Sequence, residues 1–164
     1  MSEIQTVYLL LGSNLQDRKK NITKALELLQ TKVGTMVRVS PLYETVPWGT
    51  TQGDNFLNGV VEMHCSHDPQ LLLDILHAIE DEMGRKRDPN LRYAPRIIDI
   101  DILFYADRVI SQPGIVIPHP LLHLRRFVLI PLHDLIPDFV HPILKKTVRQ
   151  LLMECEDNLS VYEY

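Results

Sequence analysis

Hydrophobic positions along the chain follow two spacings, one typical of strands and one typical of helices. Compact apolar runs bounded by turn residues predict strands at 7–11, 36–43, 55–65 and 97–104. Apolar residues three and four positions apart predict helices at 17–32 and 69–83, and a short helix that carries Val148, Leu151, Leu152 and Cys155 on one side. The second helix begins at Asp68-Pro69, an N-cap acid followed by proline, and ends at Gly84.

The order of the elements up to residue 104 is β-α-β-β-α-β, with extensions after it. This order predicts an α+β fold, the ferredoxin-like sandwich, in which an antiparallel sheet carries both helices on one face. A chain of 164 residues can bury one sizeable core without disulfides or a structural metal. We therefore predict a single domain over 1–164 with C-terminal extensions.

Composition and charge narrow the classes of partner. The chain is 45% hydrophobic and 23% charged, and no apolar stretch approaches the roughly 18 residues that a membrane span needs. The first residues lack the features of a signal peptide, and Cys65 and Cys155 show no metal or redox spacing. A pI near 5.9 does not favour general attraction to nucleic acid or anionic lipid. We expect a cytoplasmic protein that binds neither nucleic acid nor membrane.

Two aspartates one residue apart, Asp99 and Asp101, interrupt the apolar run at 97–104. Alternate residues of a strand point to the same face with α-carbons about 7 Å apart, so both carboxylates can converge on one small volume. At about 5 Å and an effective dielectric near 20, their repulsion is on the order of 3 kcal/mol. Magnesium relieves such repulsion, because it prefers carboxylate oxygens, water and substrate phosphates as ligands.

The alternative is an amphipathic strand whose two acids simply face water. In that case Ile98, Ile100, Ile102 and Phe104 lie on the core face. The segment 85–96 favours the metal site instead, because it holds five cations and one anion and is therefore +4. Since the whole chain is −4, the rest sums to −8, and the basic charge is concentrated beside the aspartates. The aspartate pair and the basic segment together predict a site for polyphosphate and magnesium.

One further acid lies at the margin of an apolar helix stripe. At helical spacing, Glu80 borders the stripe of the helix at 69–83, and His77 lies beyond it. An acid at this position can face a cleft while the helix packs on the sheet. An exposed glutamate at a helix edge is the common alternative.

At these motifs the sequence resembles the 6-hydroxymethyl-7,8-dihydropterin pyrophosphokinases of folate biosynthesis. The strongest match is the segment from Arg92 to Leu103, with a basic residue, a small residue, proline, arginine, two spacers and the aspartate pair. Shorter matches follow the same order along the chain: Gly12-Ser13-Asn14, Tyr43-Glu44-Thr45, Asn55-Phe56-Leu57-Asn58, Glu80 with Gly84-Arg85, and Pro118-His119-Pro120.

The resemblance implies an enzyme that transfers pyrophosphate from ATP, its co-substrate, to the hydroxymethyl oxygen of the pterin and releases AMP. By similarity, Asp99 and Asp101 hold two Mg²⁺ ions, and these aspartates with Arg85 and Arg96 form the catalytic set. Other matched positions contact ATP: Glu80, Arg87, Arg92, Arg96, Ile102, His119 and Arg125. Arginine suits phosphate because its planar fork donates paired hydrogen bonds and stays charged. A solvated loop charge is the alternative for each arginine.

The resemblance also implies a pterin site of stacking aromatics and hydrogen-bonding groups. Its matched residues are Thr45, Trp48, Phe56, Asn58 and Phe127. The two phenylalanines could instead be core residues.

The chain departs from the commonest family pattern at three positions: His77 where glutamine is frequent, Tyr93 for tryptophan and Ala94 for glycine. These departures affect the expected rate and loop dynamics, not the reaction class.

Two other functions remain as alternatives, a non-catalytic ferredoxin-like module that binds small molecules and an RNA-binding protein. The first has no use for an aspartate pair beside a cationic segment, and the second rests only on the basic segment and the aromatics. We expect ATP and the pterin as substrates, with no obligate protein partner.

Overall fold

The computed structural model of the chain describes residues 3–46, 54–85, 90 and 95–164. The strands are β1 Gln5–Ser13, β2 Gly34–Val39, β3 Tyr43–Thr45, β4 Phe56–Cys65, β5 Asp99–Tyr105, β6 Ile110–Gln112, β7 Ile115–Ile117 and β8 Val161–Glu163. The helices are α1 Arg18–Lys32, α2 Pro69–Glu82, the 3₁₀ turn η1 Leu122–Leu124, α3 Arg126–Leu135 and α4 Val148–Glu154.

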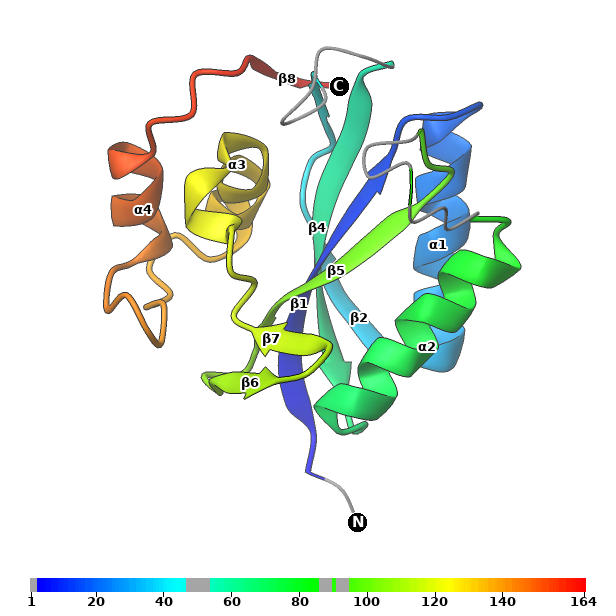
Figure 1. Cartoon of the computed structure of the whole chain (residues 1–164), viewed down its shortest axis with the longest axis horizontal. Coiled ribbons are helices and arrows are strands. Elements are labelled where there is room, and N and C mark those ends of the chain that lie inside the picture. Colours follow the sequence, from blue (N-terminus) through cyan, green and yellow to red (C-terminus); the bar gives the residue numbers. More distant parts are fainter. Residues whose placement is uncertain (1–2, 47–53, 86–89, 91–94) are drawn as a thin grey trace.

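One antiparallel sheet forms the centre of the molecule. Its strands run in the order β5-β1-β4-β3-β8, and β2 pairs with the other end of β4. Helices α1 and α2 cover one face, whereas α3 and α4 cover the opposite face (Figure 1). The sheet and its first two helices confirm the predicted ferredoxin-like sandwich, and α3, α4 and β8 are the C-terminal extensions.

Local capping explains where the two long helices begin. The side chain of Asp17 accepts a hydrogen bond from the Lys20 N–H at the start of α1. Asp68 does the same for Leu71 at the start of α2, where Pro69 occupies the first turn. Gly84 follows α2 with φ of +92°, a conformation that glycine adopts without steric cost. The predicted start and end of α2 are confirmed.

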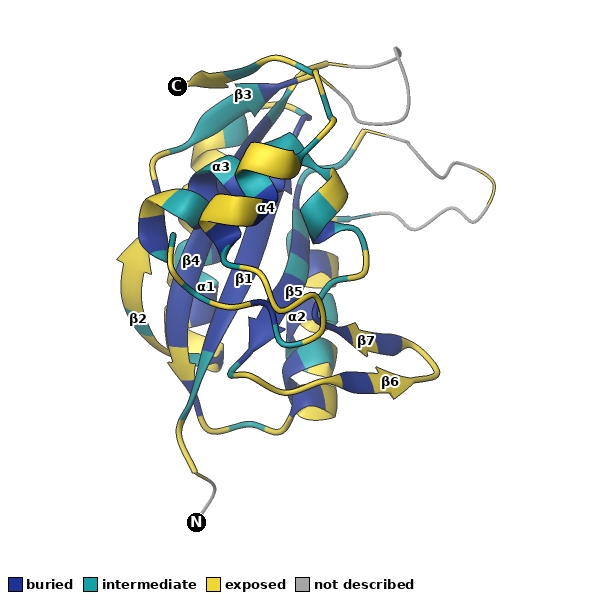
Figure 2. Ribbon diagram, turned by 90° about the vertical axis from the view of Figure 1, so that its left-hand side faces the viewer, coloured by how far each residue is buried: buried dark blue, intermediate teal, exposed yellow. Residues whose placement is uncertain are grey.

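The sheet is buried on both faces and separates two hydrophobic cores. The first core lies between the sheet and α1 with α2, and the second between the sheet and α3 with α4. Figure 2 shows β1 and β4 buried over most of their length between these layers. Burial on both faces explains why β1 contains an unbroken apolar run from Val7 to Leu11. Within the part of the chain that is described, no helix is long and apolar enough to cross a membrane.

The predicted strand at 36–43 is wrong as a single element. The structure has β2 and β3 instead, and Pro41 lies in the gap between them. Proline cannot donate to a strand ladder. Before it, Ser40 replaces regular pairing with two bonds to Val60: the Ser40 N–H donates to the Val60 carbonyl, and the Val60 N–H donates to Ser40 Oγ, each at 2.9 Å.

A register shift in β5 corrects the expected position of Phe104. Leu9 of β1 pairs with Ile102, but the preceding Tyr8 pairs with Phe104, so Leu103 is an extra residue in β5. Ile98, Ile100 and Ile102 lie in the first core as expected, whereas Phe104 belongs to the second core. Because the shift lies beyond Ile102, Asp99 and Asp101 keep a common face.

Candidate functional site

A cavity of about 430 Å³ lies where β1, β4 and β5 meet the chain after β7. In the sheet register, Gly12 of β1 lies between Asn58 of β4 and Asp99 of β5. A Cβ atom at Gly12 would lie 2.8 Å from Asn58 Oδ1. Glycine at this position therefore leaves room for the Asn58 amide.

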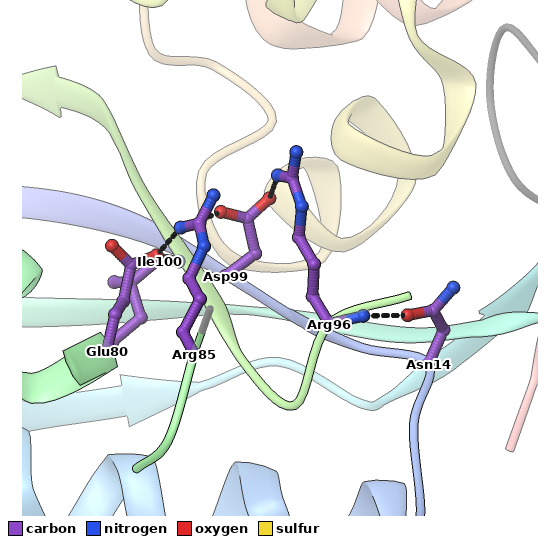
Figure 3. Close-up of polar contacts among 6 residues, drawn as sticks. All are labelled: Asn14, Glu80, Arg85, Arg96, Asp99 and Ile100. Carbon is purple, nitrogen blue, oxygen red and sulfur yellow. Dashed lines mark hydrogen bonds and ion pairs between the residues drawn. The ribbon is translucent and has the colours of Figure 1, made fainter. Parts of the chain in front are cut away.

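Asp99 lies between two arginines on one wall of the cavity (Figure 3). Its Oδ1 accepts from Arg85 Nη1 at 2.9 Å, and its Oδ2 accepts from Arg96 Nη1 at 3.0 Å. The same Nη1 of Arg85 also donates to Glu80 Oε2. Arg85 and Arg96, the first and last residues of the basic segment 85–96, therefore both bind the carboxylate of Asp99.

Glu80 joins helix α2 to strand β5. Its side chain is only 1% exposed, and Oε2 accepts from the Ile100 N–H at 3.0 Å as well as from Arg85. A buried carboxylate needs such a cationic partner, because desolvation of an isolated charge is costly. Glu80 lines the cavity as predicted, and its contacts show that it also fixes Arg85 and the start of β5.

Asp101 has a different environment from Asp99, although both line the cavity. Burial, followed by the negative charges of Asp99 and Glu80, raises the pKa of Asp101 from 3.8 to about 7. Arg125 and Arg85 oppose this shift without cancelling it. The folded protein alone therefore does not fully stabilise a second carboxylate charge here.

The donor set fits Mg²⁺ that shares its ligands with a substrate. Among the residues that the structure describes, no three His, Cys, Asp or Glu side chains are grouped as a metal site. Asp99 and Asp101 can supply two carboxylates, and water with phosphate oxygens can complete the shell, which is the arrangement that Mg²⁺ favours. A bound cation would stabilise the ionised form of Asp101 and so lower its raised pKa.

His119 contributes a neutral hydrogen-bond donor to the cavity. Burial and the nearby Arg125 lower its pKa from 6.5 to about 4. Its Nδ1 accepts from the Leu121 N–H at 3.1 Å. The proton of the neutral ring is therefore on Nε2, which is the nitrogen left to donate to an anionic ligand.

The other end of the cavity is uncharged. Thr45 and Asn58 are each 3% exposed, and Asn58 Nδ2 donates to Thr45 Oγ1 at 2.8 Å. Phe56 and Phe127 line the same cavity and are only partly buried. Phe127 also packs against the second core, and the stacking role of both rings stays a prediction.

Every predicted site residue that the structure describes lines this one cavity. On the charged side these residues are Glu80, Arg85, Arg96, Asp99, Asp101, Ile102, His119 and Arg125. The uncharged side is formed by Thr45, Phe56 and Asn58, and Phe127 lies with its ring centre 5.8 Å from the Arg125 guanidinium. Trp48, Arg87 and Arg92 lie outside the described residues, as do Tyr93 and Ala94. The individual roles remain predictions.

The sequence analysis did not identify an apolar extension of the cavity. Leu73 and His77 of α2 line it together with Ile115, Val116 and Ile117 of β7. Leu73, His77 and Glu80 follow one another at helical spacing, and that pattern is the signal that could have been used.

Asn14 was part of a matched motif but had no assigned role. Its Oδ1 accepts from the Arg96 N–H at 2.7 Å (Figure 3). Its backbone N–H donates to the Arg96 carbonyl at 3.1 Å. Its Nδ2 donates to the Asp54 carbonyl at 3.3 Å. Asn14 thereby fixes the backbone on both sides of the site. These contacts between distant residues leave no local pattern in the sequence.

Comparison with known proteins assigns the family. The family model for 7,8-dihydro-6-hydroxymethylpterin-pyrophosphokinase (HPPK) matches residues 8–137. A 2-amino-4-hydroxy-6-hydroxymethyldihydropteridine pyrophosphokinase of Aquifex aeolicus is 41% identical over 149 residues, which are 91% of each chain. The protein of the same name from Porphyromonas gingivalis is 45% identical over 138 residues, 83% of this chain and 93% of the relative.

A solved structure supports the fold. Plasmodium falciparum HPPK-DHPS with pteroate superposes with a TM-score of 0.76 at 20% identity, covering 94% of this chain and 43% of that longer chain. At this identity the likeness concerns the fold alone. The family match and the bacterial relatives, taken with the cavity geometry, lead to one assignment. This chain belongs to the 7,8-dihydro-6-hydroxymethylpterin-pyrophosphokinase family.

Proposed function

We propose that this chain transfers pyrophosphate from ATP to the hydroxymethyl oxygen of 6-hydroxymethyl-7,8-dihydropterin, with Asp99 and Asp101 as the centre of the site. Family membership supports pyrophosphate transfer in folate biosynthesis. The observation that carries the assignment of residues is the pair of carboxylates in one cavity, between a cluster of arginines and an uncharged end with two aromatics. Such a cavity suits a polyphosphate beside a flat heterocycle.

The reaction joins the pterin oxygen to the β-phosphorus of ATP. The bond between that phosphorus and the oxygen bridging to the α-phosphate breaks, AMP leaves with the bridging oxygen and its negative charge, and the proton of the pterin hydroxyl passes to solvent. Phosphoryl transfer of this kind requires positioning and charge neutralisation more than covalent chemistry from the protein.

Asp99 and Asp101 would hold Mg²⁺, and we propose two ions. When bound, the metal would neutralise phosphate charge and polarise the hydroxyl group of the pterin. Arg85 and Arg96 hold Asp99 from two sides and so fix the orientation of its carboxylate. Because these arginines stay charged, they also lower the cost of bringing a polyphosphate to the carboxylates.

The remaining residues divide between the two substrates. His119 Nε2 and the Arg125 guanidinium would donate to phosphate oxygens, and Arg87 and Arg92 are further candidates from the basic segment. The apolar extension at Leu73 and Val116 suits a nucleotide base. The pterin ring would stack between Phe56 and Phe127, while Asn58 reads its polar edge and Thr45 and Trp48 border it. We expect the reaction in the cytoplasm, without an obligate protein partner.

Conversion of ATP to AMP tests this function. We expect AMP release that requires both Mg²⁺ and the reduced hydroxymethylpterin, and loss of turnover by about 10³-fold in Asp99→Ala and in Asp101→Ala, since each change removes charge stabilisation from the reacting phosphates. Asp138→Ala is the matched control, because Asp138 is an acid 81% exposed on the surface.

Circular dichroism should show the same fold in all of these variants. Turnover within about 10-fold of wild type in either active-site variant would contradict the metal assignment. Binding of the pterin by the wild type without any AMP release would instead support the non-catalytic module.

A further inference from the structure

Arg18, in the first turn of α1, connects the ends of two strands that lead into the uncharged end of the cavity. Its Nη1 donates to Glu44 Oε1 at 2.6 Å and to the Asn55 carbonyl at 3.0 Å. Glu44 directly precedes Thr45 at the end of β3, and Asn55 directly precedes Phe56 at the start of β4. A single nitrogen therefore holds the residues next to two predicted pterin contacts.

The pairing of β3 with β4 is short and depends on this end of the sheet. Thr45 pairs with Phe56, Glu44 with Leu57 and Tyr43 with Asn58, and these are the three pairs of this ladder among the described residues. Asn58 also depends on β3 through its bond to Thr45 Oγ1. A shift of β3 against β4 would therefore move the side chain that is predicted to read the pterin edge.

Helix stability does not explain an arginine at this position. The first turn of α1 carries Arg18, Lys19 and Lys20 and no acid, although the N-terminus of a helix favours negative charge. The Arg18 side chain is nevertheless only 23% exposed, and its guanidinium lies 6.0 Å from the ring centre of Tyr164. Tyr164 follows β8, which pairs with β3 and covers its outer edge. The contacts of Arg18 across the sheet, and not its own helix, explain its placement.

We propose that Arg18 is a positioning residue for the pterin: it holds the end of β3 against the start of β4, so that Thr45, Phe56 and Asn58 keep the geometry that binds the ring. Arg18 does not line the cavity and acts only through these neighbours. The inference rests on the proposed function, because it takes the uncharged end of the cavity as the pterin site. It predicts a loss that is specific for the pterin and leaves ATP binding unchanged.

The test measures the affinity of 6-hydroxymethylpterin by calorimetry, with Mg²⁺ and a saturating non-hydrolysable ATP analogue. We expect Arg18→Ala to weaken pterin binding about 10-fold, because small misplacements of positioning groups have effects of this size or larger. Arg18→Lys should stay within about 3-fold of wild type, since one nitrogen makes both contacts and an ammonium group can replace it. Affinity for the ATP analogue should change less than about 2-fold in both variants.

Lys32→Ala is the matched control. Lys32 is in the last turn of the same helix and forms an exposed ion pair with Glu82. This variant should leave pterin affinity unchanged. Amide hydrogen exchange at 43–45 and 56–58 should accelerate in Arg18→Ala and not in Lys32→Ala, as expected for local opening of the short ladder.

Pterin affinity of Arg18→Ala equal to wild type, or equal weakening of pterin and ATP analogue, would overturn the inference. If Arg18→Ala does not fold, Glu44→Gln decides in its place: about 3-fold weaker pterin binding is expected, and unchanged binding overturns the proposal. A wild-type protein that binds the pterin without releasing AMP would contradict the proposed function, while the comparison of variants would still test the role of Arg18.

Discussion

At the uncharged end of the cavity, Thr45 and Asn58 are joined by one hydrogen bond between neutral groups, whereas in the charged part the carboxylates of Glu80, Asp99 and Asp101 lie close enough to repel one another. Asp99 and Glu80 have arginine partners there, but Asp101 has a pKa raised to about 7. The first arrangement contains no charge that a ligand must balance. The second is completed only by added positive charge. The contrast indicates that the charged part of the cavity needs added positive charge to ionise all three carboxylates, whereas the Thr45–Asn58 pair does not.

Removal of Arg85 should have the largest effect on stability, because Arg85 forms an ion pair with the buried Glu80. We expect Arg85→Ala to lower the free energy of unfolding by about 3 kcal/mol, as is typical when one partner of a buried pair is lost. Arg96→Ala should cost less than about 1 kcal/mol, because Arg96 is 27% exposed and pairs with the accessible Asp99. Urea unfolding at pH 7 measures both values.

A double variant separates the loss of charge from the loss of packing. Arg85→Ala with Glu80→Gln should recover much of the stability, since the amide oxygen can still accept from the Ile100 N–H and the buried charge of Glu80 is removed. Equal destabilisation by Arg85→Ala and Arg96→Ala would contradict the distinction between a buried and an accessible ion pair in this site.

Local signals in the sequence were sufficient to predict the helix and the strand that position the charged part of the site. Asp68-Pro69 and Gly84 mark the ends of α2 because capping and left-handed backbone depend on one or two residues. The common face of Asp99 and Asp101 follows from strand alternation alone. These are short-range properties, so one sequence was enough to predict them.

The features that could not be predicted from the sequence depend on contacts between residues far apart in the chain. The extra residue Leu103 is set by how β5 pairs with β1, and it carries Phe104 to the second core. The bonds between Asn14 and Arg96 join residues 82 positions apart, and no periodicity reports them. Strand register and side-chain networks of this kind depend on the packed fold and not on local propensity.

The pH dependence of stability should separate Asp101 from an ordinary surface acid. Because its pKa rises from 3.8 unfolded to about 7 folded, the folded state binds more protons between these values, and stability falls as the pH rises through this window. In metal-free protein, Asp101→Asn should remove that fall. Each pKa unit corresponds to about 1.4 kcal/mol, and solvent in the cavity screens part of it, so we expect the variant to be about 2 kcal/mol more stable at pH 8.

Urea unfolding from pH 4 to pH 8 in the presence of a chelator measures this difference, with Asp138→Asn as the exposed control. Addition of Mg²⁺ and a non-hydrolysable ATP analogue should stabilise the wild type much more than Asp101→Asn, because bound cations remove the repulsion that raised the pKa. If the wild type and Asp101→Asn gave parallel pH profiles of stability, the prediction that the surroundings raise the pKa of Asp101 would be wrong.

Thr45→Val should produce the smallest effect and the most selective one. The substitution keeps the shape of the side chain but removes the acceptor that orients the Asn58 amide, so we expect the KM for the pterin to rise about 10-fold. The KM for ATP should stay within about 2-fold, and Thr45→Ser should retain most of the pterin affinity because it keeps the hydroxyl. Steady-state kinetics at low and high salt sharpen the comparison, since a neutral hydrogen bond is insensitive to screening, while the binding of ATP to the arginines weakens with ionic strength. If the rise in pterin KM caused by Thr45→Val changed with salt concentration, pterin binding at the uncharged end would depend on the charges in the other part of the cavity. The two parts could then not be treated as independent.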